Sequence, residues 1–324
     1  MTNYKKKLVI GTRSSSLAMA QTKLFVDKLL LSYPDMSHNA IQICPIKTSG
    51  DQNQSVRLDQ MGGKGLFAKE IETELLEETI DLAVHSMKDI PADENSELSI
   101  GCWLERFDHR DAILCNQNIQ SISDLSKNSL IGTSSIRRRS QIINLRNDLS
   151  IKSLRGNVDT RIKKLTEKEF DAIILSVAGL KRLSLDHLIS FIFSEDEILP
   201  ASCQGAIGIQ MKSNNDDLKS FLSPLNHQLT EDLCSIERDV LIEIKANCNS
   251  PIGILATNEN NRIKLKCDIF NHDGNKIYSN TLFDIYSQTS EIGKKMGKDI
   301  LLNLGQKKID NLDILKNDFD YTTK

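Results

Sequence analysis

Apolar and polar residues in the first half of the chain follow two alternating patterns. Short apolar runs at 7–12, 40–46 and 81–86 have the length and composition of buried strands. Between them, residues 16–33 and 66–80 carry apolar side chains at the spacing of amphipathic helices. Strands that alternate with helices in this order predict a parallel sheet covered by helices.

A second copy of this pattern follows later in the chain. Residues 130–135 (LIGTSS) resemble residues 9–14 (VIGTRS), because each run is an apolar strand, then Gly-Thr, then hydroxyl residues that open a helix. Residues 171–176 (DAIILS) resemble the strand DLAVHS in the first half. We therefore predict two similar α/β domains, with residues 200–212 returning the chain to the first.

The pattern changes from about residue 228. Residues 230–244 and 290–304 read as helices, and three stretches between them alternate as half-buried strands do. This predicts a small α+β domain with an antiparallel sheet. The predicted boundaries are 1–105 with 204–226 for domain 1, 106–203 for domain 2, and 227–324 for domain 3.

One long polar segment, residues 47–65, fits neither pattern and is rich in Gly, Gln and Asn. A loop of this length inside a compact domain is typically functional or disordered. We expect a lid over a binding site, and a plain flexible insertion is the open alternative.

Composition narrows the class of protein. The net charge of −3 argues against a nucleic-acid binder. The chain has neither the apolar region of a signal peptide nor an apolar run of about 20 residues, which predicts a cytoplasmic protein without membrane contact. Its seven cysteines show no CxxC motif and no Cys/His pairing at metal spacing, which predicts free thiols and no metal site.

Arginine is used sparingly and is concentrated in one region. Lysine outnumbers it 28 to 13, yet seven of the thirteen arginines fall between residues 137 and 182. Guanidinium groups are preferred where a carboxylate or phosphate must be held by two hydrogen bonds. Arg137 and Arg138 lie in the first turn of a predicted helix, where unpaired N–H groups already favour an anion.

Further cations follow predicted strands, where open α/β sheets bind ligands. These are Arg13, Lys88, Arg155, Arg161 and Arg182. So many cations favour a ligand with several carboxylates over a single phosphate. A solvated basic face or a nucleic-acid patch is the alternative, and we assign Arg139 and Arg146, which would point elsewhere on the helix, to this alternative.

Asp89, His85 and two cysteines also stand out in the sequence. Asp89 follows Lys88 just past a strand and is either an ion-pair partner, or a general acid/base or a stabiliser of a cationic intermediate. We expect His85 to be packed or hydrogen-bonded. Cys248 and Cys203 stand among turn-forming residues with little to pack against, so Cys248 is either a covalent attachment point or an ordinary thiol.

Nine motifs, in order and at matching spacing, resemble the porphobilinogen deaminase (hydroxymethylbilane synthase) family between residues 7 and 256. They are IGTRSSSLAMAQ, GGKGLFAKEIE, DLAVHSMKDIPA, RDAIL, GTSSIRRRSQ, LRGNVDTRIKKL, DAIILSVAGLKRL, PASCQGAIGI and NCNSPIG.

The resemblance implies two domains like the halves of periplasmic binding proteins, plus a small C-terminal domain. It implies a monomeric transferase of porphyrin and heme biosynthesis that condenses four porphobilinogens, with loss of ammonia, into hydroxymethylbilane. It also implies a dipyrromethane cofactor joined by a thioether to Cys248.

The resemblance also assigns site residues. Asp89 matches the catalytic aspartate. Cofactor contacts fall on Cys248, Arg13, Ser15, Ser86, Lys88, Asp89, Thr133, Ser134, Arg137, Arg138, Arg155 and Gly156. Substrate contacts fall on Arg13, Gln21, Lys64, Arg155, Arg161, Arg182 and Gln204.

The sequence departs from the family pattern at a few positions. Ala246 and Asn247 stand where relatives often have two glycines, Gln60 stands where they often have lysine, and Cys203 stands where a small residue is common. The competing function is a non-catalytic binder of a polycarboxylate small molecule. Such a binder needs the arginines but not Asp89 or Cys248.

Overall fold

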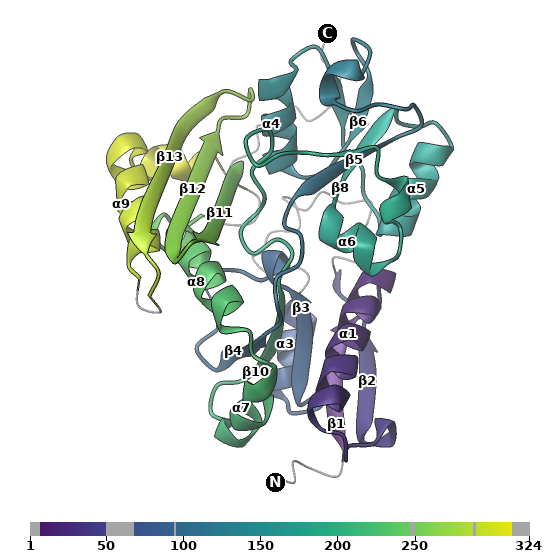
Figure 1. Ribbon diagram of the computed structural model, residues 1–324, viewed down its shortest axis with the longest axis vertical. Helices are drawn as coiled ribbons and strands as arrows, with labels where there is room; N and C mark the ends of the chain where they lie inside the picture. The colour runs from purple at the N-terminus through teal and green to yellow at the C-terminus, as the bar shows by residue number, and fades with distance from the viewer. Residues whose placement is uncertain (1–6, 50–67, 94, 247–249, 288–289, 313–324) are drawn as a thin grey trace. The chain divides into compact units, whose positions relative to one another are not determined.

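The computed structural model describes residues 7–49, 68–93, 95–246, 250–287 and 290–312 (Figure 1). The chain divides into two compact units, Met1–Phe107 with Gly205–Asp232, and Asp108–Gln204 with Leu233–Lys324. The predicted boundaries of three domains stay a prediction. Most of the predicted lid, including Gln60 and Lys64, lies outside the described residues, as does Cys248.

The first unit contains a five-stranded sheet in the order β2-β1-β3-β10-β4. Its strands are β1 Leu8–Arg13, β2 Ile41–Ile46, β3 Leu82–Ser86, β4 Leu98–Trp103 and β10 Ile207–Lys212. β1 runs parallel to β2 and β3, whereas β10 runs antiparallel to β3 and β4. The return of the chain to the first sheet is therefore confirmed, and the returning strand lies inside the sheet.

Helices cover both faces of this sheet because successive strand residues point to opposite sides. α1 (Ser16–Ser32) and α7 (Asp216–Leu222) bury Phe25 and Leu218 in one apolar cluster with Ile10. α3 (Lys69–Leu76) buries Ile71 in a second cluster, against which Val9 packs. Short 3₁₀ turns complete the unit at η1 His38–Ala40, η2 Met87–Asp89 and η5 Ser223–Leu225.

The second unit repeats this topology, with the strand order β7-β6-β8-β5-β9. Its strands are β5 Asp111–Cys115, β6 Leu130–Gly132, β7 Ser150–Lys152, β8 Ala172–Ser176 and β9 Phe191–Ile192. β6 is parallel to β7 and β8, and β5 is antiparallel to β8 and β9. The predicted repeat of two similar α/β domains is confirmed, although each sheet is mixed and not purely parallel.

Helices cover this sheet on both faces as well. α4 (Ile136–Leu145) buries Ile142 in one apolar cluster, while α5 (Val158–Thr166) and α6 (Val177–Arg182) bury Leu165 and Leu180 in another. The turns η3 Ile122–Asp124 and η4 Asp186–Leu188 lie between strands.

A three-stranded antiparallel sheet completes the second unit, as the sequence predicts. It contains β11 Ile252–Glu259, β12 Arg262–Phe270 and β13 Lys276–Ile285, with α9 Ile292–Leu304 and α10 Gln306–Asp310 (Figure 1). The helix α8 Gln228–Glu243 begins in the first unit and continues into the second from Leu233. The β12–β13 turn contacts α4, because Arg139 Nη1 donates to the His272 carbonyl at 2.7 Å. Arg139 therefore links two parts of this unit and does not lie on a solvated face.

Within the described ranges, no helix combines the length and the apolar character needed to span a bilayer.

Candidate functional site

The carboxyl ends of β1 and β3 form a pocket in the first unit. Arg13 ends β1, Ser86 ends β3, and Asp89 follows on η2. These three residues line the pocket together with Ser15 and Gln21. The structure thus brings together five of the residues that the sequence assigns to the site.

Polar contacts organise this pocket. Gln21 Nε2 donates to Ser86 Oγ at 2.7 Å, and Ser15 Oγ accepts from the backbone of Ala18 at 3.3 Å, which caps α1. Arg13 Nη1 lies 3.8 Å from Asp89 Oδ2, and 34% of the Asp89 side chain is exposed. The carboxylate is therefore paired with a cation yet accessible to a ligand. Lys88 is half-buried on the same turn.

His85 lines this pocket but is buried, and its Nε2 lies 3.1 Å from Gln210 Oε1. Burial lowers the pKa of His85 to about 4, with the nearby Arg13 charge acting in the same direction. The expectation of a packed, hydrogen-bonded histidine is confirmed.

This histidine gives a pH prediction. An unfolded histidine titrates near 6.5, so between pH 6.5 and 4 the unfolded chain binds a proton that the folded chain excludes. Stability should therefore fall as the pH falls through this window, by up to about 3 kcal/mol from this residue. Urea unfolding at several pH values measures the slope. His85→Gln should flatten it, and the exposed His187→Gln should not.

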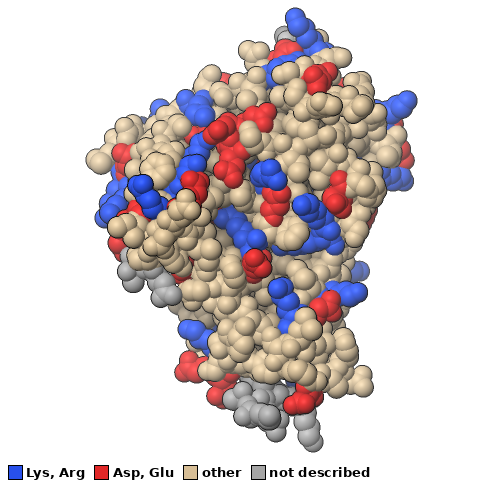
Figure 2. Space-filling model, in the orientation of Figure 1, with Lys and Arg blue, Asp and Glu red and all other residues tan. Residues whose placement is uncertain are grey.

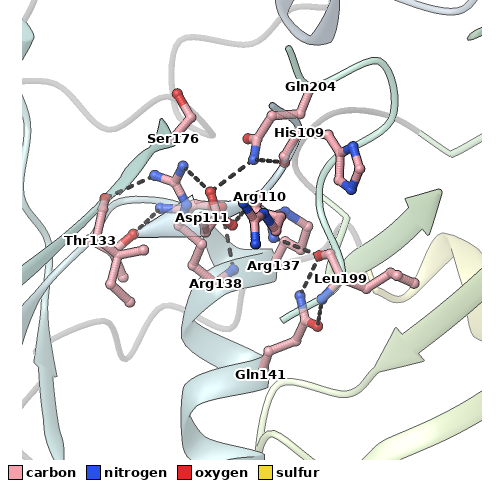
Figure 3. A network of polar contacts seen from close by, with 12 residues as sticks. His109, Arg110, Asp111, Thr133, Arg137, Arg138, Gln141, Ser176, Leu199 and Gln204 are labelled. Carbon is pink, nitrogen blue, oxygen red and sulfur yellow. Dashed lines mark hydrogen bonds and ion pairs between the residues drawn. The ribbon is translucent and has the colours of Figure 1, made fainter. Parts of the chain in front are cut away.

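In the second unit, a buried ion-pair network surrounds the start of α4 (Figure 3). Arg137 Nη2 and Arg138 Nη2 each lie 2.7 Å from a different oxygen of Asp111. Asp111 is fully buried, and both arginines are 5% exposed. Arg137 Nη1 also donates to the Leu199 carbonyl at 2.7 Å, and Arg138 Nη1 donates to the Ile174 carbonyl at 3.0 Å.

The charges in this network do not balance. Burial alone would raise the pKa of Asp111, but the two guanidiniums outweigh it and hold this pKa well below its usual range. Burial lowers the pKa of Arg137, and the attraction of Asp111 offsets this only in part, because the positive charge of Arg138 lowers the same pKa further. Two cations thus face one anion. The Nε atoms of both arginines are buried without a hydrogen-bond partner among the described residues.

The remaining predicted residues of this unit lie in or next to its strand-to-helix loops, and Arg161 lies in the first turn of α5. Thr133 is buried after β6, and Ser134 Oγ donates to the Leu154 carbonyl at 2.7 Å. Arg161 Nε donates to the Gly156 carbonyl at 2.7 Å. Gly156 has a φ of +112°, which side chains rarely adopt, so this turn needs glycine.

Arg155 and Arg182 complete the predicted cations of this unit. Arg155 lies in the same loop as Gly156, next to it in the chain. Arg182 ends α6, and burial lowers its pKa to about 10.

Besides Arg139, two residues differ from their sequence-based interpretation. Arg146, which follows the last turn of α4, does not lie on an open basic face. Its Nε donates to Asp148 at 2.7 Å, and its Nη1 donates to the Ile122 carbonyl in η3. Cys203 was expected to have little to pack against, but it is 1% exposed, and its thiol lies 3.6 Å from the Cys234 carbonyl. The turn that contains it folds inward.

One cluster was not visible in the sequence. The ligand atoms of Cys203, Cys234 and Glu237 lie within 4.8 Å of one another, a spacing that a metal ion could bridge. The Glu237 carboxylate already accepts backbone N–H groups from Cys203 at 2.5 Å and Ala256 at 2.8 Å. The Glu237 carboxylate therefore has a structural role, because it ties two backbone segments together.

Sequence reasoning missed Asp111 as a site residue. It opens the apolar strand DAILC, and a carboxylate at the head of a buried strand is the one signal that could have identified it. Gln204 was predicted to contact substrate. In the structure its amide donates to Asp111 Oδ1 at 2.9 Å and to the His109 carbonyl at 2.7 Å.

Charged side chains of both signs are mixed on one face of the described surface. Figure 2 shows Lys and Arg interspersed with Asp and Glu across the face drawn.

Comparison with known proteins agrees with the motifs. Residues 8–220 match the family model described as porphobilinogen deaminase, dipyromethane cofactor binding domain. Residues 232–302 match the model described as porphobilinogen deaminase, C-terminal domain.

Curated relatives match over nearly the whole chain. Porphobilinogen deaminase of Oceanobacillus iheyensis is 39% identical over 97% of this chain and 99% of its own. The porphobilinogen deaminase of Buchnera aphidicola is 40% identical over 96% of this chain and 98% of its own length. The chloroplastic enzyme of Pisum sativum is 40% identical over 91% and 81%.

Among solved structures, the periplasmic aliphatic sulphonate binding protein of Escherichia coli is a distant likeness. It has a TM-score of 0.39 and 14% identity, and the match covers 75% of this chain and 71% of the other. The family models together span most of the residues described above, and the curated relatives carry the same name. The chain belongs to the porphobilinogen deaminase family.

Proposed function

We propose that this chain condenses four porphobilinogen molecules into hydroxymethylbilane, with release of four ammonia molecules and with one water molecule that frees the product, using a dipyrromethane cofactor attached through a thioether to Cys248. The observation that carries the proposal is the buried pair Arg137 and Arg138, whose two charges share one carboxylate, within the region that matches the cofactor-binding domain. Porphobilinogen carries an acetate and a propionate, so a growing chain of pyrroles is rich in carboxylates.

The donor set fits such a cofactor. Buried N–H donors without partners are rare, and a carboxylate is the acceptor that guanidinium binds most strongly. The orphaned Nε atoms of Arg137 and Arg138 therefore suit a pyrrole carboxylate. Further contacts would come from Arg13, Ser15, Ser86, Lys88, Thr133, Ser134, Arg155 and Gly156. When bound, the cofactor supplies the primer on which the tetrapyrrole chain is built.

We assign Asp89 the role of the catalytic group, and its position and exposure support this assignment. Its carboxylate is reachable from the pocket and lies next to Arg13, which holds it in place. As ammonia leaves porphobilinogen, positive charge develops on the substrate ring, and an adjacent carboxylate stabilises that charge. The same oxygen can accept the proton that is lost when the new carbon–carbon bond forms.

The remaining cations would hold the substrate carboxylates. Arg13, Arg155, Arg161 and Arg182 are assigned this role, with Gln21, Gln204 and Lys64 as polar partners. We also propose that the protein works in the cytoplasm, in keeping with the free thiols of its six described cysteines. We further propose that it is a monomer. Sedimentation analysis of the purified protein tests the monomer.

The proposed function is tested by supplying purified protein with porphobilinogen and following ammonia and hydroxymethylbilane together. We expect four ammonia molecules for each tetrapyrrole formed. Saturable binding of porphobilinogen without release of ammonia would instead support the non-catalytic binder of polycarboxylates.

A further inference from the structure

Asp111 is the centre of the arginine network. It is the first residue of β5 and is fully buried. Its Oδ2 accepts from Arg137, and its Oδ1 accepts from both Arg138 and Gln204 (Figure 3). A planar carboxylate that binds through both oxygens fixes where each Nη2 atom lies.

The second end of each guanidinium is fixed by the backbone. Arg137 Nη1 is held by the Leu199 carbonyl, and Arg138 Nη1 is held by the Ile174 carbonyl. Two anchor points on a planar group set its orientation. In both arginines this orientation leaves the same atom, Nε, without a partner among the described residues.

The anchors are themselves braced. The Gln204 amide ties Asp111 to the His109 carbonyl. The Gln141 side chain binds Leu199 twice, accepting from its N–H at 2.7 Å and donating to its carbonyl at 2.9 Å.

The strand β11 packs against Leu199 at Gly253. A Cβ on Gly253 would lie 2.7 Å from that of Leu199, so no larger residue fits there. The Leu199 carbonyl that holds Arg137 therefore cannot shift toward β11 without moving that strand.

We propose that Asp111, braced by Gln204, is a positioning residue that orients the Arg137 and Arg138 guanidiniums toward the carboxylates of the cofactor. This inference rests on the proposed function. It gives Gln204 a role in bracing the network, beyond the predicted contact with substrate. The competing explanation is that Asp111 only neutralises buried charge and so maintains the fold.

The test compares Asp111→Asn with a matched control, Asp148→Asn, which removes the carboxylate partner of Arg146 at the other end of α4. Intact mass gives the fraction of protein that carries the cofactor. Steady-state kinetics give KM and the kcat per loaded enzyme, and urea unfolding gives stability. For Asp111→Asn we expect a lower loaded fraction and a kcat per loaded enzyme reduced about 10- to 100-fold, with little change in KM. Asp148→Asn should match the wild type in loading and kcat.

A kcat per loaded enzyme equal to wild type in Asp111→Asn would overturn the proposal, because a purely structural residue lowers loading and stability alone. If Asp111→Asn does not fold, Gln204→Leu decides, since it keeps the Asp111 charge and removes the brace. Gln204→Leu should lower loading and kcat in the same direction, and unchanged values would overturn the proposal. A wild type without cofactor or product would overturn the proposed function, and this inference with it.

Discussion

Replacing Asp89 with asparagine should lower kcat by about 10³-fold while leaving the fold and the cofactor in place. The substitution keeps the size of the side chain but removes the negative charge that offsets the cation formed as ammonia leaves. It also removes the oxygen that takes up the proton. Single-turnover and steady-state assays with porphobilinogen measure the loss, and intact mass reports the cofactor.

Loss of folding cannot account for this result. The Asp89–Arg13 pair is partly exposed at 3.8 Å, and such pairs contribute less than about 1 kcal/mol. Glu78→Gln is the matched control, since it removes the charge of a carboxylate that is paired with Lys212 in the same unit. Turnover by Asp89→Asn close to that of Glu78→Gln would remove Asp89 from the mechanism.

Replacing Arg138 with leucine should reduce cofactor loading and lower kcat/KM by about 10- to 100-fold. The variant loses one of the two guanidiniums that share Asp111, and with it an orphaned Nε–H donor suited to a carboxylate. Charge-assisted hydrogen bonds of this kind contribute about 1.5–3 kcal/mol each, which sets the expected range. Intact mass and initial rates measure the two effects.

Arg146→Leu is the control for this variant. Arg146 also bonds to a carboxylate and to backbone carbonyls, but at the far end of α4. The Arg146→Leu variant should be less stable than the wild type but should keep the wild-type cofactor loading and kcat/KM. Equal losses of loading in the two variants would mean that any arginine that stabilises α4 serves the cofactor equally well.

The sequence predicts the main elements because each has its own hydrophobic period. The runs at 7–12 and 81–86 become β1 and β3, and LIGTSS opens β6 and then α4. The antiparallel direction of β5 and β10 is not encoded in those runs. The direction of a strand relative to its neighbours depends on how the chain passes from one sheet to the other, and the local hydrophobic pattern does not encode that path.

The sequence predicts the site residues that follow strands directly, but not the buried residues whose partners are remote in the chain. Arg13, Ser86 and Asp89 follow strands directly, so their convergence in a pocket follows from topology. Asp111 was missed because its partners Arg137 and Arg138 are remote in sequence and because it reads as the polar start of an apolar strand. Burial of the Cys203 thiol likewise depends on Cys234, which lies on a separate helix.

The central claim is tested most directly by the intact mass of the purified protein beside a Cys248→Ser variant. The wild type should exceed its sequence mass by two deaminated porphobilinogen units, and the variant should show no excess. An unmodified wild type, or an excess that survives the substitution, would contradict a dipyrromethane cofactor anchored at Cys248.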